Sequence, residues 1–251
     1  MTPSTPSRSD PTLVVHGFPP VWGQPSPSPF ATKLETWLRM AGLPYRTALI
    51  AGRPRSKSGK FPYITTPDGR LLSDSSIIIE TLTAEHGVTL DAHLTPLERA
   101  HARMLQRTLE EHLYWMIVWS RWVRPGGFEH VRRDYFRHAP PALAGLIARV
   151  ARRAAKQQVV AQGMGRHDDA RLLRLATQDL EAVEALLGDK DTVFGAPSTA
   201  DAIVFAFVGA CLTTPGDCSL AALVRARPRL VAHVERIRTR HWQSPAERAS
   251  R

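Results

Sequence analysis

The stretch Lys60–Glu80, with the sequence KFPYITTPDGRLLSDSSIIIE, decides how this chain is expected to fold. Its first half predicts a short strand, a turn at Pro67-Asp68-Gly69 and a second strand. Pro62 cannot donate a backbone hydrogen bond to a sheet, so we expect it immediately before the first strand. Asp74 and Ser75 precede an apolar run, and their side chains can cap the unpaired N–H groups that open a helix. The stretch therefore predicts a β-hairpin followed by a helix.

A second set of elements lies upstream of this hairpin. Residues 12–17 predict a strand, and residues 45–50 predict another. Between them, residues 28–42 predict a helix in which Ser28 is the N-cap and Gly42 is the stop. The order is β-α-β followed by β-β-α, which is the order of thioredoxin-like α/β domains.

These residues resemble the thioredoxin-like half of glutathione transferases. That family carries a cis X–Pro bond before its third strand, matched by Phe61-Pro62, and an acidic-Ser pair at the next helix, matched by Asp74-Ser75. The resemblance implies that the backbone of Phe61 hydrogen-bonds glutathione beside Pro62, and that Asp74 and Ser75 hold its γ-glutamyl end. A helix N-terminus suits that role because its free N–H groups and its dipole attract anions. The alternative is a structural hairpin in which Ser75 only caps the helix.

Ser28-Pro29-Phe30-Ala31 lies where glutaredoxin-like relatives carry Cys-Pro-Phe/Tyr-Cys. Both cysteine positions are lost, so disulfide exchange at this site is excluded, because it requires a thiolate on the protein. The resemblance implies instead that the hydroxyl of Ser28 hydrogen-bonds the thiolate of bound glutathione, as in serine-type transferases. Such a bond is worth about 1.5–3 kcal/mol, or roughly one to two pKa units. Ser26 is a second candidate for this role, and Ser28 could equally be only the N-cap.

Further motifs narrow the resemblance to the branch of the superfamily that contains the failed axon connections and metaxin-like proteins. They are short segments around the predicted helix and hairpin, namely Ser28-Pro29-Phe30, Lys33-Leu34-Glu35-Thr36, Met40–Tyr45, Pro62-Tyr63-Ile64, Asp74-Ser75 and Ile78-Ile79. Relatives in this branch often keep a cysteine where this chain has Ala31, so the chain departs there. Some members serve as interaction or import components. The resemblance leaves two functions open: conjugation of glutathione to an apolar electrophile, or a non-catalytic interaction module.

The second half of the chain predicts helices after a linker at residues 87–94. Thr95 and Glu98 form a capping box that opens a long helix. From Leu113 to Val123 this helix is apolar on nearly every side, which indicates burial or cover by a ligand or partner. We expect core packing for most of its aromatic side chains.

Three more segments follow this helix. Residues 124–141 are expected to be irregular, because Pro125-Gly126-Gly127 breaks the chain. Residues 141–162 predict a helix with a basic face that could meet phosphates or anionic lipid, although a solvated face is favoured. The side chains of this face are Arg149, Arg152, Arg153 and Lys156, opposite Leu146, Ile147 and Val150. Ser198 and Asp201 form a second capping box; glutathione transferases carry the same box on a central helix, where it serves folding.

We therefore expect a disordered tail at residues 1–11, a thioredoxin-like glutathione-binding domain at residues 12–87 and an all-helical bundle at residues 95–242. This arrangement is the glutathione transferase fold. The tail is rich in Thr, Ser and Pro and lacks the apolar segment of a signal peptide. The most apolar run, residues 202–212, is too short to span a bilayer. We expect a cytoplasmic protein without a membrane span.

Charge and cysteine content add weaker expectations. The chain has 251 residues and a net charge of +10, and the excess is almost all arginine. Such a positive net charge is typical of proteins that bind acidic partners, but it can also result from a coding bias toward arginine. We favour coding bias and expect no nucleic-acid partner. Cys211 and Cys218 suggest neither a disulfide scaffold nor zinc spacing, so we expect no metal site. The resemblance implies glutathione as a substrate and a possible homodimer.

Overall fold

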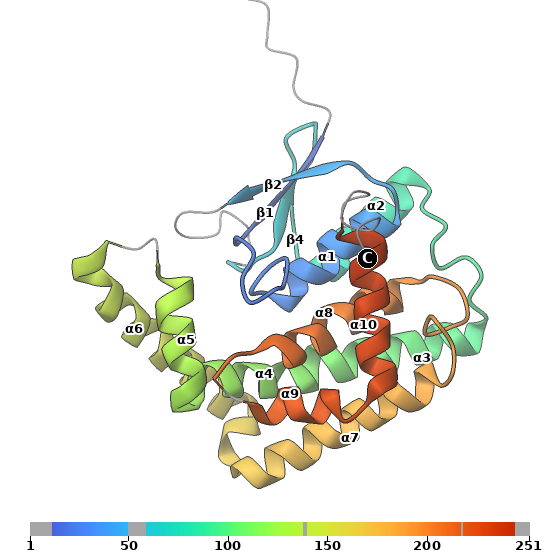
Figure 1. The fold of residues 1–251 in the computed structure, drawn as a ribbon. Coiled ribbons are helices and arrows are strands. Elements are labelled where there is room, and N and C mark those ends of the chain that lie inside the picture. The colour runs from blue at the N-terminus through green and yellow to red at the C-terminus, as the bar shows by residue number, and fades with distance from the viewer. Residues whose placement is uncertain (1–11, 50–58, 138–139, 217, 244–251) are drawn as a thin grey trace, which may run out of the picture.

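The structure is a computed structural model that describes residues 12–49, 59–137, 140–216 and 218–243. The predicted tail at residues 1–11 lies outside the described residues. A small sheet with two helices is followed by a larger helical part (Figure 1), so the predicted fold class is confirmed. The elements of the first part are β1 (Leu13–Gly17), α1 (Pro29–Met40), β2 (Tyr45–Leu49), β3 (Tyr63–Thr65), β4 (Leu71–Ser73) and α2 (Ser75–His86).

The four strands form one sheet in the order β2-β1-β3-β4. β1 runs parallel to β2 and antiparallel to β3, and β3 pairs with β4 in antiparallel fashion. Val15 and Ile64 are partners in the register of β1 and β3, and both are fully buried. They belong to one core cluster with Leu34 and Leu38 of α1 and Ile78 of α2. Both helices therefore cover the same face of the sheet.

The sequence explains where α1 begins and ends. The hydroxyl of Ser28 accepts a hydrogen bond from the N–H of Ala31, and Pro29 is the first helical residue. Gly42, just past the helix, has a φ of +69°, which lets the chain turn toward β2. α1 is mostly buried because α8 packs against it as well as α2 (Figure 1).

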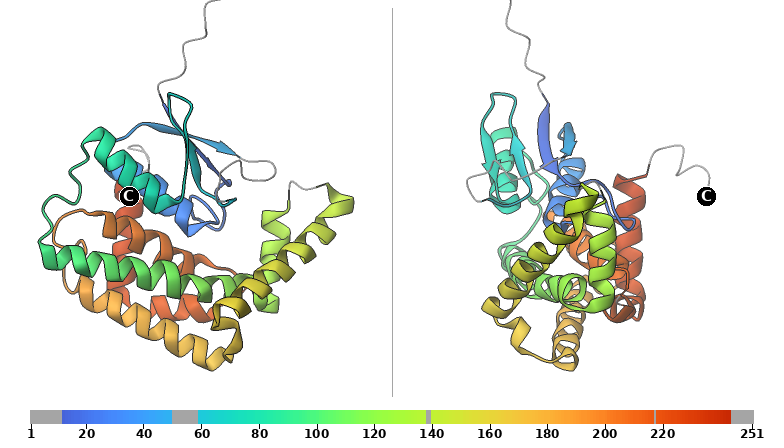
Figure 2. Two further views of the ribbon diagram at one scale, coloured as in Figure 1. Left: turned by 180° about the vertical axis from the view of Figure 1, so that it is seen from behind. Right: turned by 90° about the vertical axis from the view of Figure 1, so that its left-hand side faces the viewer.

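The helical part is built around one long helix and one central helix. Its elements are α3 (Pro96–Arg107), η1 (Thr108–Leu113), α4 (Tyr114–Val118), η2 (Trp119–Val123), α5 (Pro125–Tyr135), α6 (Pro141–Gln162), η3 (Met164–Arg166), α7 (Asp169–Leu187), α8 (Thr199–Thr213), α9 (Cys218–Arg225) and α10 (Pro228–His241). α3, η1, α4 and η2 follow one another directly, and both η1 and η2 are π-helical. Seen from behind, this long helix runs between the sheet part and α7 (Figure 2). All residues of α8 from Ala200 to Cys211 are buried, which makes α8 the centre of the bundle.

The prediction that residues 124–141 are irregular is wrong over most of that range, because α5 runs from Pro125 to Tyr135. Pro125 is the first helical residue, where its missing N–H costs nothing. Gly127 lies against the backbone of η2, and a Cβ on it would overlap the carbonyl oxygen of Ser120. This glycine therefore permits close packing of two helices and does not end one.

Both predicted capping boxes are present. In α3 the N–H of Thr95 donates to the carboxylate of Glu98 at 2.8 Å, and the N–H of Glu98 donates to the hydroxyl of Thr95 at 3.3 Å. At α8 the carboxylate of Asp201 accepts hydrogen bonds from the N–H groups of Val193 and Ser198, each at 2.8 Å. The first box is exposed to solvent, whereas Asp201 is fully buried.

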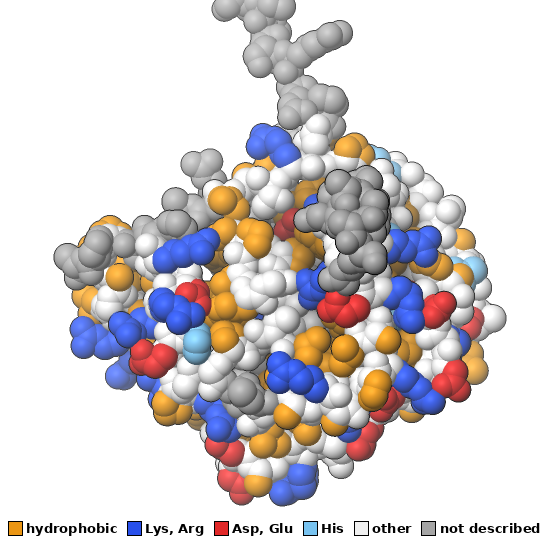
Figure 3. Space-filling view, in the orientation of Figure 1, with side chains coloured by type: hydrophobic (Ala, Val, Ile, Leu, Met, Phe, Trp, Pro, Cys, Tyr) orange, Lys and Arg blue, Asp and Glu red, His pale blue; other side chains and the backbone are white. Residues whose placement is uncertain are grey.

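α5 and α6 project from the side of the bundle (Figures 1 and 2). The apolar side chains of Leu146 and Val150 are exposed, and Arg152 instead donates hydrogen bonds to the carbonyls of Trp122 and Val123. Lys and Arg side chains gather on this projection, at the left of Figure 3. Among the residues that the structure describes, no helix combines the length and apolarity that crossing a bilayer requires.

Candidate active site

The first part of the candidate site is the start of β3. The Phe61–Pro62 peptide bond is cis, as predicted. Pro62 is buried, whereas Phe61 is half-buried between two other rings. Its ring lies edge-on to Phe18, with centroids 5.0 Å apart, and stacks on Tyr63 at 5.7 Å. Because Phe18 directly follows β1, these contacts hold Phe61 beside the end of that strand.

The second part is the N-terminus of α2. The carboxylate of Asp74 accepts hydrogen bonds from the N–H groups of Ser76 at 2.9 Å and Ile77 at 3.4 Å, so it caps the helix as predicted. The φ of Asp74 is +73°, a region that non-glycine residues rarely adopt and that recurs at binding sites. Asp74 is exposed, whereas Ser75 is only 3% exposed. The pair thus places an exposed carboxylate and a buried serine at the helix N-terminus.

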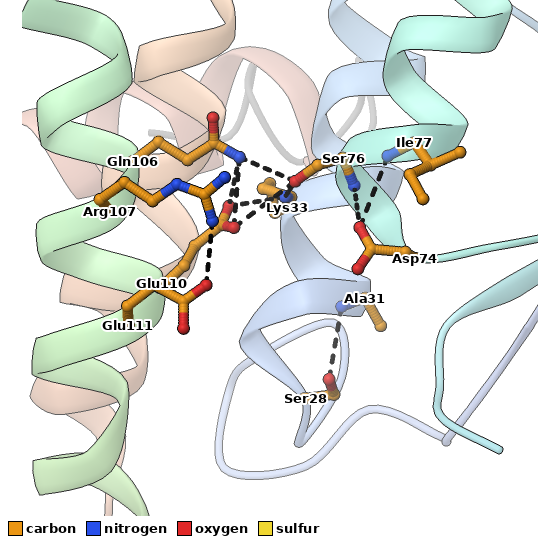
Figure 4. Close-up of polar contacts among 10 residues, drawn as sticks. All are labelled: Ser28, Ala31, Lys33, Asp74, Ser76, Ile77, Gln106, Arg107, Glu110 and Glu111. Atoms are coloured by element: carbon orange, nitrogen blue, oxygen red, sulfur yellow. Dashed lines mark hydrogen bonds and ion pairs between the residues drawn. The ribbon is translucent and has the colours of Figure 1, made fainter. Parts of the chain in front are cut away.

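The third part is the N-terminus of α1, which packs against α2. Figure 4 shows Ser28 and Asp74 at the N-terminal ends of the two helices. Ser28 is half-buried, and its hydroxyl accepts a hydrogen bond from the N–H of Ala31 at 3.4 Å. Ser26 is 3% exposed, and its hydroxyl oxygen accepts a hydrogen bond from the N–H of Ser28 at 3.2 Å. The two serines are therefore not equivalent: Ser28 is the accessible one, and Ser26 supports its backbone.

A buried polar network lies between α1, α2 and the long helix (Figure 4). The ammonium of Lys33 is 2.6 Å from the carboxylate of Glu110 and 3.0 Å from the hydroxyl of Ser76. The amide of Gln106 donates to the same hydroxyl at 2.7 Å. Burial lowers the pKa of Lys33, and the carboxylate of Glu110 opposes that shift. The network therefore connects Ser76, which follows Ser75, to α1 in the sheet part and to the long helix in the helical part.

Metal ligands and a reactive thiol are two further kinds of group that the described residues could supply. Within the described residues, no group of three His, Cys, Asp or Glu side chains could hold a metal ion. Cys211 is a free, buried cysteine, and burial raises the pKa of its thiol to about 12. Such a thiol is protonated and inert near neutral pH. What the site offers is hydrogen bonding and the electrostatics of two helix N-termini.

Comparisons with known proteins show the family of this chain. Residues 29–127 match the family description "Glutathione S-transferase N-terminal domain", and residues 176–237 match "Glutathione S-transferase, C-terminal domain". An isoprene-epoxide–glutathione S-transferase from Rhodococcus sp. (strain AD45) is 32% identical over 237 residues, which cover 91% of this chain and 99% of that protein. The chain belongs to the glutathione S-transferase family.

Two further similarities concern the branch of the family and the fold. Failed axon connections from Drosophila melanogaster is 29% identical over 227 residues, which cover 85% of this chain and 54% of that protein. The predicted resemblance to this branch of the glutathione S-transferase superfamily is thus confirmed. A solved glutathione S-transferase from Methylobacterium radiotolerans, in complex with glutathione sulfonate, has a TM-score of 0.60 at 17% identity and covers 95% of this chain and 93% of that one. This likeness shows the fold.

Sequence reasoning missed the residues of this glutathione S-transferase fold that hold the loop before α1. Arg121 of η2 donates a hydrogen bond to the carbonyl of Pro27 at 2.7 Å, although it lies in a segment predicted to be apolar on nearly every side. Trp22 donates to the carboxylate of Asp134 at 2.6 Å and stacks on Tyr135, with centroids 5.1 Å apart. The only signal in the sequence was a single arginine within a run of apolar and aromatic residues.

Proposed function

We propose that this glutathione S-transferase family member binds glutathione across the N-termini of α1 and α2 and conjugates it to a small apolar electrophile. The backbone of Phe61, beside the cis Pro62, binds the peptide backbone of glutathione. Asp74 and Ser75 bind its γ-glutamyl end. Support comes from the exposed side chain of Asp74 and from the dipole at the N-terminus of α2, which suit the charged groups of this ligand.

We assign to the hydroxyl of Ser28 the hydrogen bond that stabilises the thiolate of bound glutathione. The oxygen of Ser28 accepts the N–H of Ala31, which leaves the hydroxyl hydrogen available to donate, so the capping and thiolate-binding roles are compatible. Ser26 is buried and accepts the N–H of Ser28, so we assign it the support of Ser28. The half-buried Ser28, placed as the N-cap of α1, is the observation that carries the proposal.

An epoxide is the electrophile class that we propose, because the similar Rhodococcus protein is named as a transferase of isoprene epoxide. The thiolate sulfur would attack a ring carbon and form a C–S bond while the C–O bond breaks. The resulting alkoxide takes a proton, and the product is a hydroxyalkyl thioether. Phe30, which directly follows the Ser28-Pro29 step, packs edge-on against Tyr114 at 4.9 Å, and we place the apolar part of the electrophile near this pair.

Calorimetry with glutathione tests the proposal. Wild-type protein is expected to bind glutathione, and Ser75→Ala is expected to bind it about tenfold more weakly or worse, because a hydrogen bond to a charged ligand group is lost. Ser73→Ala, in the adjacent strand β4, is the matched control and should bind like wild type. Conjugation is then followed with a small aliphatic epoxide. Equal affinities of Ser75→Ala and wild type would contradict the assignment of Ser75.

The alternative proposal is a non-catalytic interaction module. It is favoured by the absence of cysteine at Ser28 and Ala31 and by the similarity to Failed axon connections. Wild-type protein that neither binds glutathione nor conjugates it would support this alternative. For either function we keep the domain limits 12–87 and 95–242, a cytoplasmic location and a homodimer as proposals.

A further inference from the structure

Arg121 is a buried arginine whose described polar partners are all neutral. It is 4% exposed. Nη1 donates to the carbonyl of Pro27 at 2.7 Å and Nε to the hydroxyl of Thr214 at 3.0 Å. Nη2 donates to the carbonyl of Ala210 at 3.1 Å, and Nη1 lies 3.4 Å from the hydroxyl of Tyr135. Its guanidinium is thus held in one orientation between η2, α5, the end of α8 and the loop before α1.

The Pro27–Ser28 peptide unit is held on both sides. Its carbonyl accepts the hydrogen bond from Arg121, and its N–H donates to the hydroxyl of Ser26 at 3.2 Å. A peptide is planar, so two such bonds fix the plane from which the side chain of Ser28 departs. The direction of the Ser28 hydroxyl therefore depends on a residue of the helical half.

No described carboxylate lies within ion-pairing distance of Arg121 to neutralise its charge. An arginine stays protonated in proteins. The charge of Arg121 acts on the pKa of three titratable groups, namely Tyr114 of α4, Tyr135 of α5 and Cys211 of α8. Burial raises the pKa of each of them. All three are neutral near pH 7. The carboxylate of Asp134, next to Tyr135 in the sequence, lies 2.6 Å from Nε of Arg133 and accepts a hydrogen bond from the indole N–H of Trp22.

We propose that Arg121 is a positioning residue for conjugation: it orients Ser28, and its positive charge, which no described carboxylate neutralises, lowers the pKa of the glutathione thiol bound at Ser28. This inference rests on the proposed function. The guanidinium contacts the carbonyl of the peptide unit that precedes Ser28. A cation in this place favours the thiolate over the thiol, and burial weakens the screening of its charge by water. Arg121 does so through the protein and without touching glutathione.

Two substitutions at Thr214 distinguish an effect of charge on the thiol pKa from an effect of side-chain shape. Thr214 is 4% exposed and contacts Nε of Arg121. Thr214→Asp places a carboxylate of similar volume against the guanidinium, and Thr214→Asn places an uncharged group there. The thiol pKa of bound glutathione is read from thiolate absorbance, and conjugation is measured against pH. Thr214→Asp is expected to raise that pKa by about one unit, which reduces turnover about tenfold below the pKa and leaves the high-pH limit unchanged. Thr214→Asn should match wild type in both measurements.

Each outcome separates this inference from the proposed function. A thiol pKa that is equal in Thr214→Asp and wild type, in proteins with the same circular dichroism, would overturn the role of Arg121 and leave the transferase intact. Wild-type protein that does not bind glutathione would overturn the proposed function and this inference with it. Should Thr214→Asp not fold, Arg121→Gln and Arg121→Lys give the same comparison. Lysine keeps the charge and should keep the lower pKa; equal pKa values in these two variants would overturn the inference.

Discussion

The ammonium of Lys33 and the carboxylate of Glu110 lie 2.6 Å apart, and the two side chains are only 1% and 6% exposed. Lys33 belongs to α1 of the sheet part, and Glu110 belongs to η1 of the helical part. Removing two charges from water is costly, and their attraction offsets that cost only while both are present. The pair therefore makes the packing of the two halves sensitive to the loss of either partner.

Single substitutions in this pair are expected to be more harmful than a double one. Lys33→Met and Glu110→Leu should each lower the free energy of unfolding by about 3–5 kcal/mol, because each leaves one buried charge without its partner. The double variant should lie within about 1–2 kcal/mol of wild type, since it leaves no charge. Urea denaturation of the four proteins gives the comparison. If the double variant lost the sum of the two single losses, the buried pair would not be the cause.

Gly127 and Gly145 make a matched pair in two neighbouring helices. Gly127→Ala is expected to destabilise the protein by at least about 2 kcal/mol, because the new Cβ overlaps the carbonyl oxygen of Ser120. Gly145 in α6 is exposed and has no atom near its missing Cβ, so Gly145→Ala should stabilise the protein by about 0.5–1 kcal/mol. Thermal denaturation measures both. A stable Gly127→Ala variant would show that α5 does not pack against η2 as closely as described.

The two capping boxes offer a comparison of the same motif in different surroundings. Glu98→Ala removes the exposed acceptor of the Thr95 N–H and should cost about 0.5–1.5 kcal/mol. Asp201→Ala should cost more, because it leaves the buried N–H groups of Val193 and Ser198 unsatisfied at about 1–3 kcal/mol each. Glutathione affinity should not change in either variant. Equal losses of stability in chemical denaturation would argue against a buried Asp201.

Local sequence patterns were enough for most of the fold. Caps and stops such as Ser28, Asp74 and Gly42 act within a few residues of their own position, so each of them could be read without the rest of the chain. α5 was missed for the opposite reason. The role of Gly127 depends on Ser120 of the preceding segment, and a contact between backbones leaves no pattern in the sequence beyond the glycine itself.

The residues of the candidate site also divide into those that local motifs mark and those that matter because of distant contacts. Phe61-Pro62, Asp74-Ser75 and Ser28 stand in local motifs, so the sequence could nominate them. The choice between Ser26 and Ser28 could not be made, because it rests on which hydroxyl is buried and which bond it accepts. Lys33 and Arg121 could not be nominated, because their importance comes from Glu110 and Pro27, which are 77 and 94 residues away along the chain.

The thiol pKa of bound glutathione, measured for wild type, Ser28→Ala and Ser26→Ala, tests the central claim most directly. Ser28→Ala should raise it by roughly one to two units, because the hydrogen bond to the thiolate is lost, while glutathione affinity changes little. Ser26→Ala should raise it less, since it removes only a support of Ser28. A pKa that is unchanged in Ser28→Ala, or that rises only in Ser26→Ala, would contradict the assignment of the thiolate to Ser28.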